Sequence, residues 1–228
     1  MLAIRQPAWL PYVLPMAAFL ILTSLEGYLP KTEAGPDPTW YVLAYTLKVV
    51  VVTALMVVCR STWQDLRTFP GIGVILAAIG LGLVVTALWV KVPSPAIPFL
   101  GGGTRAGFDP YVLNPSLFYV FLAVRFFGLV VMVPIFEEIF WRSFLNRSVI
   151  DQDFTKVPVG KVTALSAVIV SALFALAHPE WVPALLTGLL WAGLLWKTKS
   201  LSACVVSHMS ANLGLGIYVF ATKSWIYW

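Results

Sequence analysis

The sequence predicts an all-α fold, a polytopic membrane bundle of about seven transmembrane helices within a range of six to eight. The first observation is composition: 60% of the 228 residues are hydrophobic and 11% are charged, against roughly 45–50% and about 25% in soluble domains. So few polar residues cannot cover the exterior of a soluble domain of this size. The second observation is a series of long apolar runs, each near the roughly 20 residues that span a bilayer as a helix. We therefore expect one integral membrane domain over residues 1–228, surrounded by lipid.

The apolar runs define the candidate spans 9–29, 40–59, 72–92, 116–136, 161–178, 181–196 and 201–221. Tryptophan residues fall near the ends of these spans, where amphipathic rings settle at the membrane interface. Trp191 is the exception, because it lies within a span. The stretch 93–115 is rich in proline and glycine and predicts an irregular outer loop. This loop either caps a cavity or only connects two spans.

Charge predicts the orientation of the chain. The net charge is +5, but lysine and arginine are dispersed rather than gathered in a basic stripe, which argues against a nucleic-acid partner. With the N-terminus inside, the inner segments carry Arg5, Arg60, Arg67, Arg142, Arg147, Lys156, Lys161, Lys197 and Lys199, and the outer ones Lys31, Lys91, Arg105 and Lys223. The positive-inside rule then predicts a cytoplasmic N-terminus. We expect a bacterial inner (cytoplasmic) membrane, where Cys59 and Cys204 stay reduced on the inner side.

Two adjacent carboxylates, Glu137 and Glu138, interrupt an apolar run. Ionisable residues at membrane depth are costly and usually face a bundle interior or a water-filled cavity. Glu138 and Arg142 are four residues apart and share a helix face, so they can form an ion pair. Glu137 points about 100° away around the helix and lacks that partner, which suits a general base. The alternative is an interfacial helix with an ordinary surface ion pair.

The chain contains 2 histidines, and both fall in predicted membrane helices. His208 and Asn212 are four residues apart and present to one face, whereas His178 ends the fifth span. A single membrane histidine is typical of helix–helix hydrogen bonding, but together with the carboxylates these residues favour a site. If the helix that carries Glu137 continues to residue 150, as the apolar run 139–149 favours, the helical rise places all these groups at middle depths. If that helix instead stops at Glu137, the carboxylates lie at the inner surface and His178 lies near the outer one, so they cannot form one site.

Three motifs carry a resemblance to a known family. They are Glu137-Glu138-x-x-x-Arg142, Phe174-x-x-x-His178 and His208-x-x-x-Asn212. The sequence resembles the CPBP family of intramembrane proteases, also called the Abi or CAAX-protease family, whose members carry EExxxR, FxxxH and HxxxN in this order. The resemblance covers residues 134–213, which we take as the catalytic core. A more specific similarity is to the CAAX-protease-related proteins found with bacterial exosortase systems.

The resemblance implies a glutamate-dependent intramembrane endopeptidase without a cofactor. Its substrate would be a membrane-anchored protein or peptide, for example a prenylated C-terminal tail or a membrane-bound precursor. Glu137 and His178 would polarise the attacking water. His208 and Asn212 would donate hydrogen bonds to the oxyanion that develops on the scissile carbonyl.

Glu138 and Arg142 would hold the helix and orient Glu137. A zinc-dependent membrane metalloprotease stays open as an alternative, because two histidines and a glutamate form the ligand set of several catalytic zinc sites. The sequence spacing of these residues gives no support for a zinc site, since the usual HExxH helix is missing.

A second alternative is a protein without catalytic activity, either a membrane immunity or scaffold protein or a small transporter. Lys48 and Arg125 bear on this alternative, because each lies inside a predicted span and needs a carboxylate or carbonyl partner. Glu26 is one candidate partner. A transporter would more naturally show repeated halves with matched broken helices, and the sequence shows no such repeat.

Overall fold

The computed structural model describes residues 7–33, 35–95 and 107–227. Within these residues the regular structure is helical, apart from a short antiparallel pair of strands, β1 (Lys31–Thr32) and β2 (Gly35–Pro36). Of the loop predicted over 93–115, residues 96–106 lie outside the described residues.

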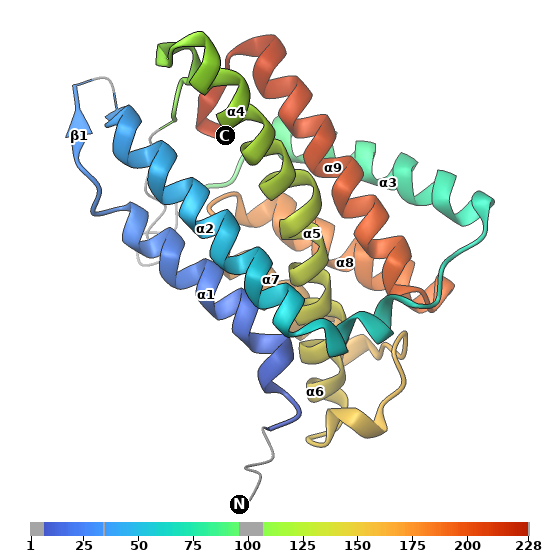
Figure 1. Cartoon of the computed structure of the whole chain (residues 1–228). Helices are drawn as coiled ribbons and strands as arrows, with labels where there is room; N and C mark the ends of the chain where they lie inside the picture. Colours follow the sequence, from blue (N-terminus) through green and yellow to red (C-terminus); the bar gives the residue numbers. More distant parts are fainter. Residues whose placement is uncertain (1–6, 34, 96–106, 228) are drawn as a thin grey trace, which may run out of the picture.

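The helices pack as one bundle, with the two strands at the end of the first helix (Figure 1). In chain order they are α1 (Leu10–Glu26), α2 (Pro38–Val58), η1 (Arg60–Leu66), α3 (Ile72–Lys91), η2 (Pro110–Val112), α4 (Pro115–Phe126), η3 (Phe127–Met132), α5 (Val133–Glu138), η4 (Ile139–Leu145), α6 (Asn146–Ile150), η5 (Phe154–Lys156), α7 (Ala164–Leu176), α8 (Trp181–Thr198), α9 (Leu201–Thr222) and η6 (Trp225–Tyr227).

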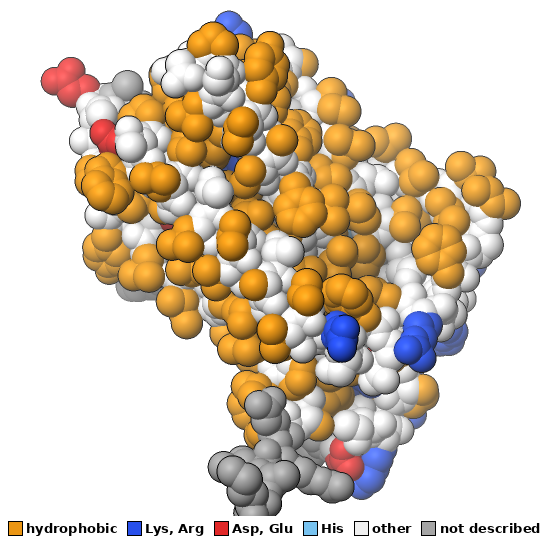
Figure 2. All heavy atoms as spheres, viewed as in Figure 1, with side chains coloured by type: hydrophobic (Ala, Val, Ile, Leu, Met, Phe, Trp, Pro, Cys, Tyr) orange, Lys and Arg blue, Asp and Glu red, His pale blue; other side chains and the backbone are white. Residues whose placement is uncertain are grey.

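Four helices in the described part of the chain are long and apolar enough to cross a membrane: α2, α3, the continuous helix Pro115–Ile150 and α9. The apolar helices α1 and α7 are shorter. Figure 2 shows one face of the molecule covered with hydrophobic side chains, while the visible charged side chains lie mainly toward its two ends. The predicted all-α membrane bundle is confirmed, and the count of seven spans stays a prediction.

The helix that carries the paired carboxylates is the longest in the bundle. It runs for 36 residues from Pro115 to Ile150, so the predicted continuation past Glu137 is confirmed. It begins at Asn114, whose side chain accepts a hydrogen bond from the Leu117 backbone N–H at 3.0 Å, as an N-cap residue should. Two π-helical segments, η3 and η4, flank α5 within it.

Arg142 and Arg147, which the charge count assigned to the inner side, lie within the long helix and are buried. Each has a buried carboxylate partner, since Arg142 pairs with Glu138 and Arg147 Nη2 lies 2.8 Å from Asp65 Oδ2. Partnered guanidinium groups of this kind are tolerated inside a protein, so neither residue reports on membrane orientation in the way that an exposed loop charge does.

Close approach of α3 and α9 fixes the position of the C-terminal helix. The two helices lie side by side (Figure 1). A Cβ atom added to Gly82 on α3 would collide with the Ser207 carbonyl oxygen on α9. One turn further along α3, Thr86 Oγ1 donates to the Ala211 carbonyl at 3.0 Å. Small residues and hydroxyl hydrogen bonds are common where membrane helices pack closely, and here they hold the segment that carries His208 and Asn212.

Substitution of Gly82 by alanine should therefore destabilise the protein by about 1–3 kcal/mol, because the added methyl group forces α3 away from α9. Gly80 on the same helix is a matched control, since a Cβ there meets nothing within 4 Å. Gly80→Ala should be neutral or slightly stabilising. Thermal unfolding of both variants in detergent measures the difference, and equal melting temperatures would contradict the close approach of the two helices.

Candidate active site

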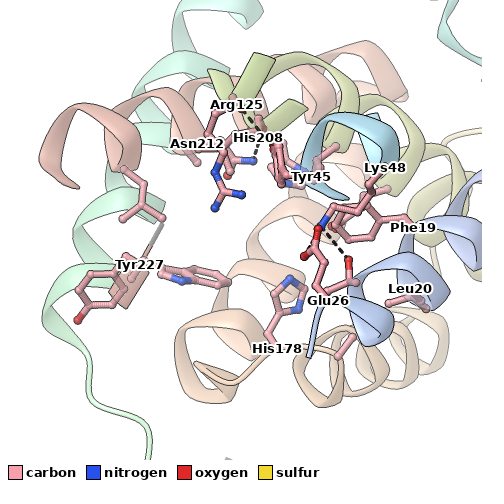
Figure 3. A pocket seen from close by; sticks show the side chains of 18 of the residues that line it. Phe19, Leu20, Glu26, Tyr45, Lys48, Arg125, His178, His208, Asn212 and Tyr227 are labelled. Atoms are coloured by element: carbon pink, nitrogen blue, oxygen red, sulfur yellow. Dashed lines mark hydrogen bonds and ion pairs between the residues drawn. The ribbon is translucent and has the colours of Figure 1, made fainter. Parts of the chain in front are cut away.

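The predicted site residues line one cavity of about 570 Å³. Its lining includes Glu137 from α5, His178 just after α7, and His208 and Asn212 from α9. Figure 3 shows His178, His208 and Asn212 around the same space. The size is that of an ordinary ligand pocket. The structure thus brings together four polar residues from three segments that are far apart in the sequence.

Glu137 and Glu138 have different surroundings although they are adjacent. Glu137 lines the cavity and is 6% exposed, whereas Glu138 is 0% exposed. The Glu137 carboxylate takes part in no hydrogen bond or ion pair with another described residue. Successive positions on a helix diverge by about 100°, which sends one carboxylate toward the cavity and the other into the protein. Glu137 is therefore the carboxylate available to a molecule in the cavity.

Glu138 joins two parts of the site. Arg142 Nη1 donates to its Oε1 atom at 3.3 Å, so the predicted ion pair is confirmed. His208 Nδ1 lies 2.9 Å from the same oxygen. The hydrogen bonds of Glu138 thus go to Arg142 and His208, and its role in orienting Glu137 stays a prediction. Spacing within one helix could not reveal this contact, which links residues 70 positions apart.

Aromatic rings enclose the buried guanidinium group of Arg142. Its central carbon lies 4.4 Å from the centre of the Phe174 ring and 4.9 Å from that of Trp191. The Trp191 ring also lies 4.4 Å from the His208 ring, and its Nε1–H donates to Ser207 Oγ at 3.0 Å. Trp191 is thus a site residue that the sequence did not predict. The one signal was its position inside a span, away from the interface.

His178 is held by the residue that starts its own motif. Its Nδ1 lies 2.7 Å from the Phe174 carbonyl oxygen, and its ring centre lies 4.4 Å from the Phe174 ring. A carbonyl oxygen only accepts hydrogen bonds, so we assign the proton of the neutral ring to Nδ1. The Nε2 atom is then the nitrogen that can accept a proton. The Trp89 ring packs against the same histidine at nearly a right angle.

Asn212 completes the hydrogen bonding of the long helix. Its Nδ2 donates to the Leu129 carbonyl at 2.8 Å. Leu129 belongs to the π-helical segment η3, where the carbonyl of residue i pairs with the N–H of residue i+5. For Leu129 that position is Pro134, which has no N–H. The Asn212 amide thus replaces a missing backbone donor, and its second N–H remains for a molecule in the cavity.

A second polar group lines the same cavity. Lys48 Nζ lies 2.8 Å from Glu26 Oε2, which confirms Glu26 as the partner of this lysine. Arg125 Nη1 donates to Tyr41 Oη at 3.3 Å, and the guanidinium carbon lies 4.3 Å from the centre of the Tyr45 ring. These contacts explain how both cations are accommodated at membrane depth.

The zinc alternative requires a group of metal-binding side chains. In residues 7–33, 35–95 and 107–227, no three His, Cys, Asp or Glu side chains are grouped so that they could hold a metal ion. Cys59 and Cys204 are free and buried.

Comparison with known proteins gives one family. A family model described as "Type II CAAX prenyl endopeptidase Rce1-like" matches residues 119–214. The matched segment contains all three motifs and most of the long helix. No curated protein and no solved structure gives a significant match.

Replacement of Glu138 by leucine should destabilise the protein by about 3–5 kcal/mol, because Arg142 would be left as a buried charge without its carboxylate. Glu138→Gln should cost less, since the amide oxygen can still accept from His208. The control is Asp153→Asn, which removes a salt bridge to Lys156. The Asp153 side chain is 48% exposed and the Lys156 side chain is 72% exposed. We expect the melting temperature of this control to be unchanged. A Glu138→Leu protein as stable as this control would contradict the central role of the buried pair.

Proposed function

We propose that the chain is an intramembrane endopeptidase that hydrolyses a peptide bond in a membrane-anchored protein, because the family model of Rce1-like type II CAAX prenyl endopeptidases matches residues 119–214. The observation that carries this proposal is the convergence of Glu137, His178, His208 and Asn212 on one cavity inside an apolar bundle. A protein that only binds a partner has no need for this convergence.

Glu137 and His178 are the acceptors that can activate water. The Glu137 carboxylate and the His178 Nε2 atom can each accept a hydrogen bond from a water molecule in the cavity. As that water attacks the scissile carbonyl carbon, Glu137 takes its proton and later delivers it to the leaving amine nitrogen. The Nδ1–H bond to the Phe174 carbonyl keeps the His178 ring in the required tautomer.

His208 and Asn212 are the donors that can stabilise the oxyanion. Asn212 offers its second amide N–H. The Nδ1–H of His208 is directed to Glu138, so His208 can donate from Nε2 only when both ring nitrogens carry a proton. In this proposal Glu138 positions His208, and Arg142 holds Glu138. A preorganised donor of this kind contributes on the order of 10²–10³ in rate.

We further propose that the substrate is a protein or peptide whose cleavage site lies at the membrane, such as a prenylated tail or a membrane-bound precursor. The family description refers to prenyl endopeptidases, and a largely apolar cavity suits a lipid-modified chain. The cytoplasmic N-terminus, the bacterial inner membrane and the link to exosortase-associated proteins belong to the same proposal. They rest on the charge distribution and on the motifs.

Glu137→Gln and His178→Ala should each abolish cleavage while leaving the protein folded, because the first removes the base that takes the proton of the attacking water and the second removes a hydrogen-bond acceptor for that water. The measurement is fluorescence release from an internally quenched peptide with an S-farnesylcysteine near its C-terminus, using purified protein in lipid vesicles. Asp151→Asn, an exposed carboxylate change, is the control and should cleave normally. Cleavage retained by Glu137→Gln would overturn the assignment. No cleavage by the unaltered protein would favour the immunity or scaffold alternative.

The proposed mechanism uses no metal, so activity should survive chelation. We expect full cleavage in the presence of a strong chelator, and less than stoichiometric zinc in metal analysis of the purified protein. Loss of activity in chelator, with recovery on addition of zinc, would replace this mechanism by the metalloprotease alternative.

A further inference from the structure

Exposed cations gather where the candidate spans α3 and α9 begin, far from the cavity. α3 begins at Ile72 and α9 begins at Leu201. The segments that lead into these helices and the neighbouring segment before α7 carry four exposed cations, which we call the basic surface: Arg67, Lys161, Lys197 and Lys199. Among the residues that the structure describes, none of these four forms an ion pair.

Hydrogen bonds hold one of these cations beside the first turn of α9. Ser200 Oγ donates to the Thr68 carbonyl oxygen, and Ser202 Oγ donates to the Leu66 carbonyl oxygen. The two bonds lie on either side of Arg67 in the sequence. The backbone of Arg67 is therefore fixed against the segment that connects α8 to α9.

That connecting segment brings the three lysines to the same place. Lys199 Nζ donates to the Gly160 carbonyl oxygen at 3.3 Å and lies 5.8 Å from the centre of the Trp196 ring. Lys161 directly follows Gly160, and Lys197 precedes Lys199 by two residues. The basic surface thus joins segments of the chain that are far apart in sequence.

Nearby carboxylates are mostly engaged elsewhere. Asp65 is buried and pairs with Arg147. Asp153 pairs with Lys156, and Asp151 accepts a hydrogen bond from the Asp153 backbone N–H. Asp151 is thus the one exposed carboxylate of the described 151–163 segment that has no ion pair, against four cations of the basic surface. The excess of positive charge at this surface favours an anionic partner.

Large apolar side chains stand beside the cations. Phe69 is 71% exposed, Ile72 is 72% exposed and Trp196 is 60% exposed. Figure 2 shows lysine and arginine side chains among hydrophobic ones near the start of α9, as located in Figure 1. Aromatic rings of this kind settle at the level of lipid headgroups. Cations mixed with exposed apolar side chains at the ends of spans therefore favour a lipid over a soluble acidic protein.

The chemistry of a phospholipid headgroup matches this surface. A phosphate group accepts paired hydrogen bonds from arginine and charge-assisted ones from lysine. In phosphatidylcholine the choline cation balances the phosphate charge, whereas phosphatidylglycerol keeps a net negative charge. Basic residues directly beside membrane helices recognise lipids with such a charge.

We propose that Arg67, Lys161, Lys197 and Lys199 form a binding surface for the headgroups of anionic phospholipids. None of the four lines the cavity, so the proposal is independent of the proposed function. A bound headgroup would bridge the segment before α3 and the segment before α9. It would thereby stabilise the start of the helix that carries His208 and Asn212.

The test is native mass spectrometry of the purified protein in detergent with equal amounts of phosphatidylglycerol and phosphatidylcholine. We expect the unaltered protein to retain mainly phosphatidylglycerol. Arg67→Gln, Lys197→Gln and Lys199→Gln should each lower this preference by about fivefold, the contribution of one cation near an anionic headgroup. Arg67→Lys, which keeps the charge, should retain most of the preference. High salt should weaken the preference in the unaltered protein, because exposed charges are screened.

Lys91→Gln is the matched control. Lys91 is an exposed cation at the other end of α3, and the 20 residues of that helix separate it from the basic surface by roughly 30 Å. This variant has the same net charge as Lys199→Gln and should keep the full preference. An equal loss in Lys91→Gln and Lys199→Gln would show an effect of net charge alone and would overturn the proposal.

An acidic protein is the other kind of partner that a basic surface could bind. Polyglutamate added to the protein in vesicles of phosphatidylcholine serves as its probe. We expect it to bind the unaltered protein and Lys199→Gln equally weakly. If phosphatidylglycerol is not preferred, and polyglutamate binds the unaltered protein but not Lys199→Gln, the surface serves an acidic protein and the lipid proposal is overturned. Equal retention of the two lipids by the unaltered protein overturns it as well.

Discussion

The buried carboxylate of Glu138 is the constraint on which the rest of the site depends. It accepts hydrogen bonds from Arg142 on its own helix and from His208 on α9. Removal from water makes an isolated carboxylate very costly, so both partners must stay in place. Arg142 is in turn held between the Phe174 and Trp191 rings. A single buried side chain thus links the long helix, through Arg142 and its aromatic neighbours, to α7, α8 and α9, and with them the side chains that face the cavity.

The long helix solves a second problem, which is how to place polar chemistry within an apolar span. Two π-helical segments flank α5, and Pro134 leaves the Leu129 carbonyl without its backbone donor. In lipid such a group must be satisfied within the protein, and Asn212 does this. The same hydrogen bond holds Asn212 at the cavity. Irregular backbone and a polar side chain therefore stabilise each other, and neither would be tolerated alone at this depth.

The sequence predicted the membrane bundle, the continuation of the helix past Glu137 and the convergence of the motif residues. The first two depend on composition and helical spacing, which are local properties of the sequence, and the convergence followed from the helical rise, which placed the motif residues at similar depths. It did not predict the contact of Glu138 with His208 or the burial of Trp191 beside that histidine, because both join helices that are distant in sequence. Arg142 and Arg147 were counted among the inner charges, and such a count cannot distinguish a loop cation from one with a buried carboxylate partner.

The distribution of charge within the cavity gives the site a direction. At one end, Glu137 is a carboxylate without an ion-pair partner among the described residues, and at the other Lys48 pairs with Glu26 and the Arg125 guanidinium group lies over the Tyr45 ring. In surroundings of low polarity, charges interact strongly over distances at which water would screen them. The two ends of the cavity therefore offer a bound molecule different electrostatic surroundings.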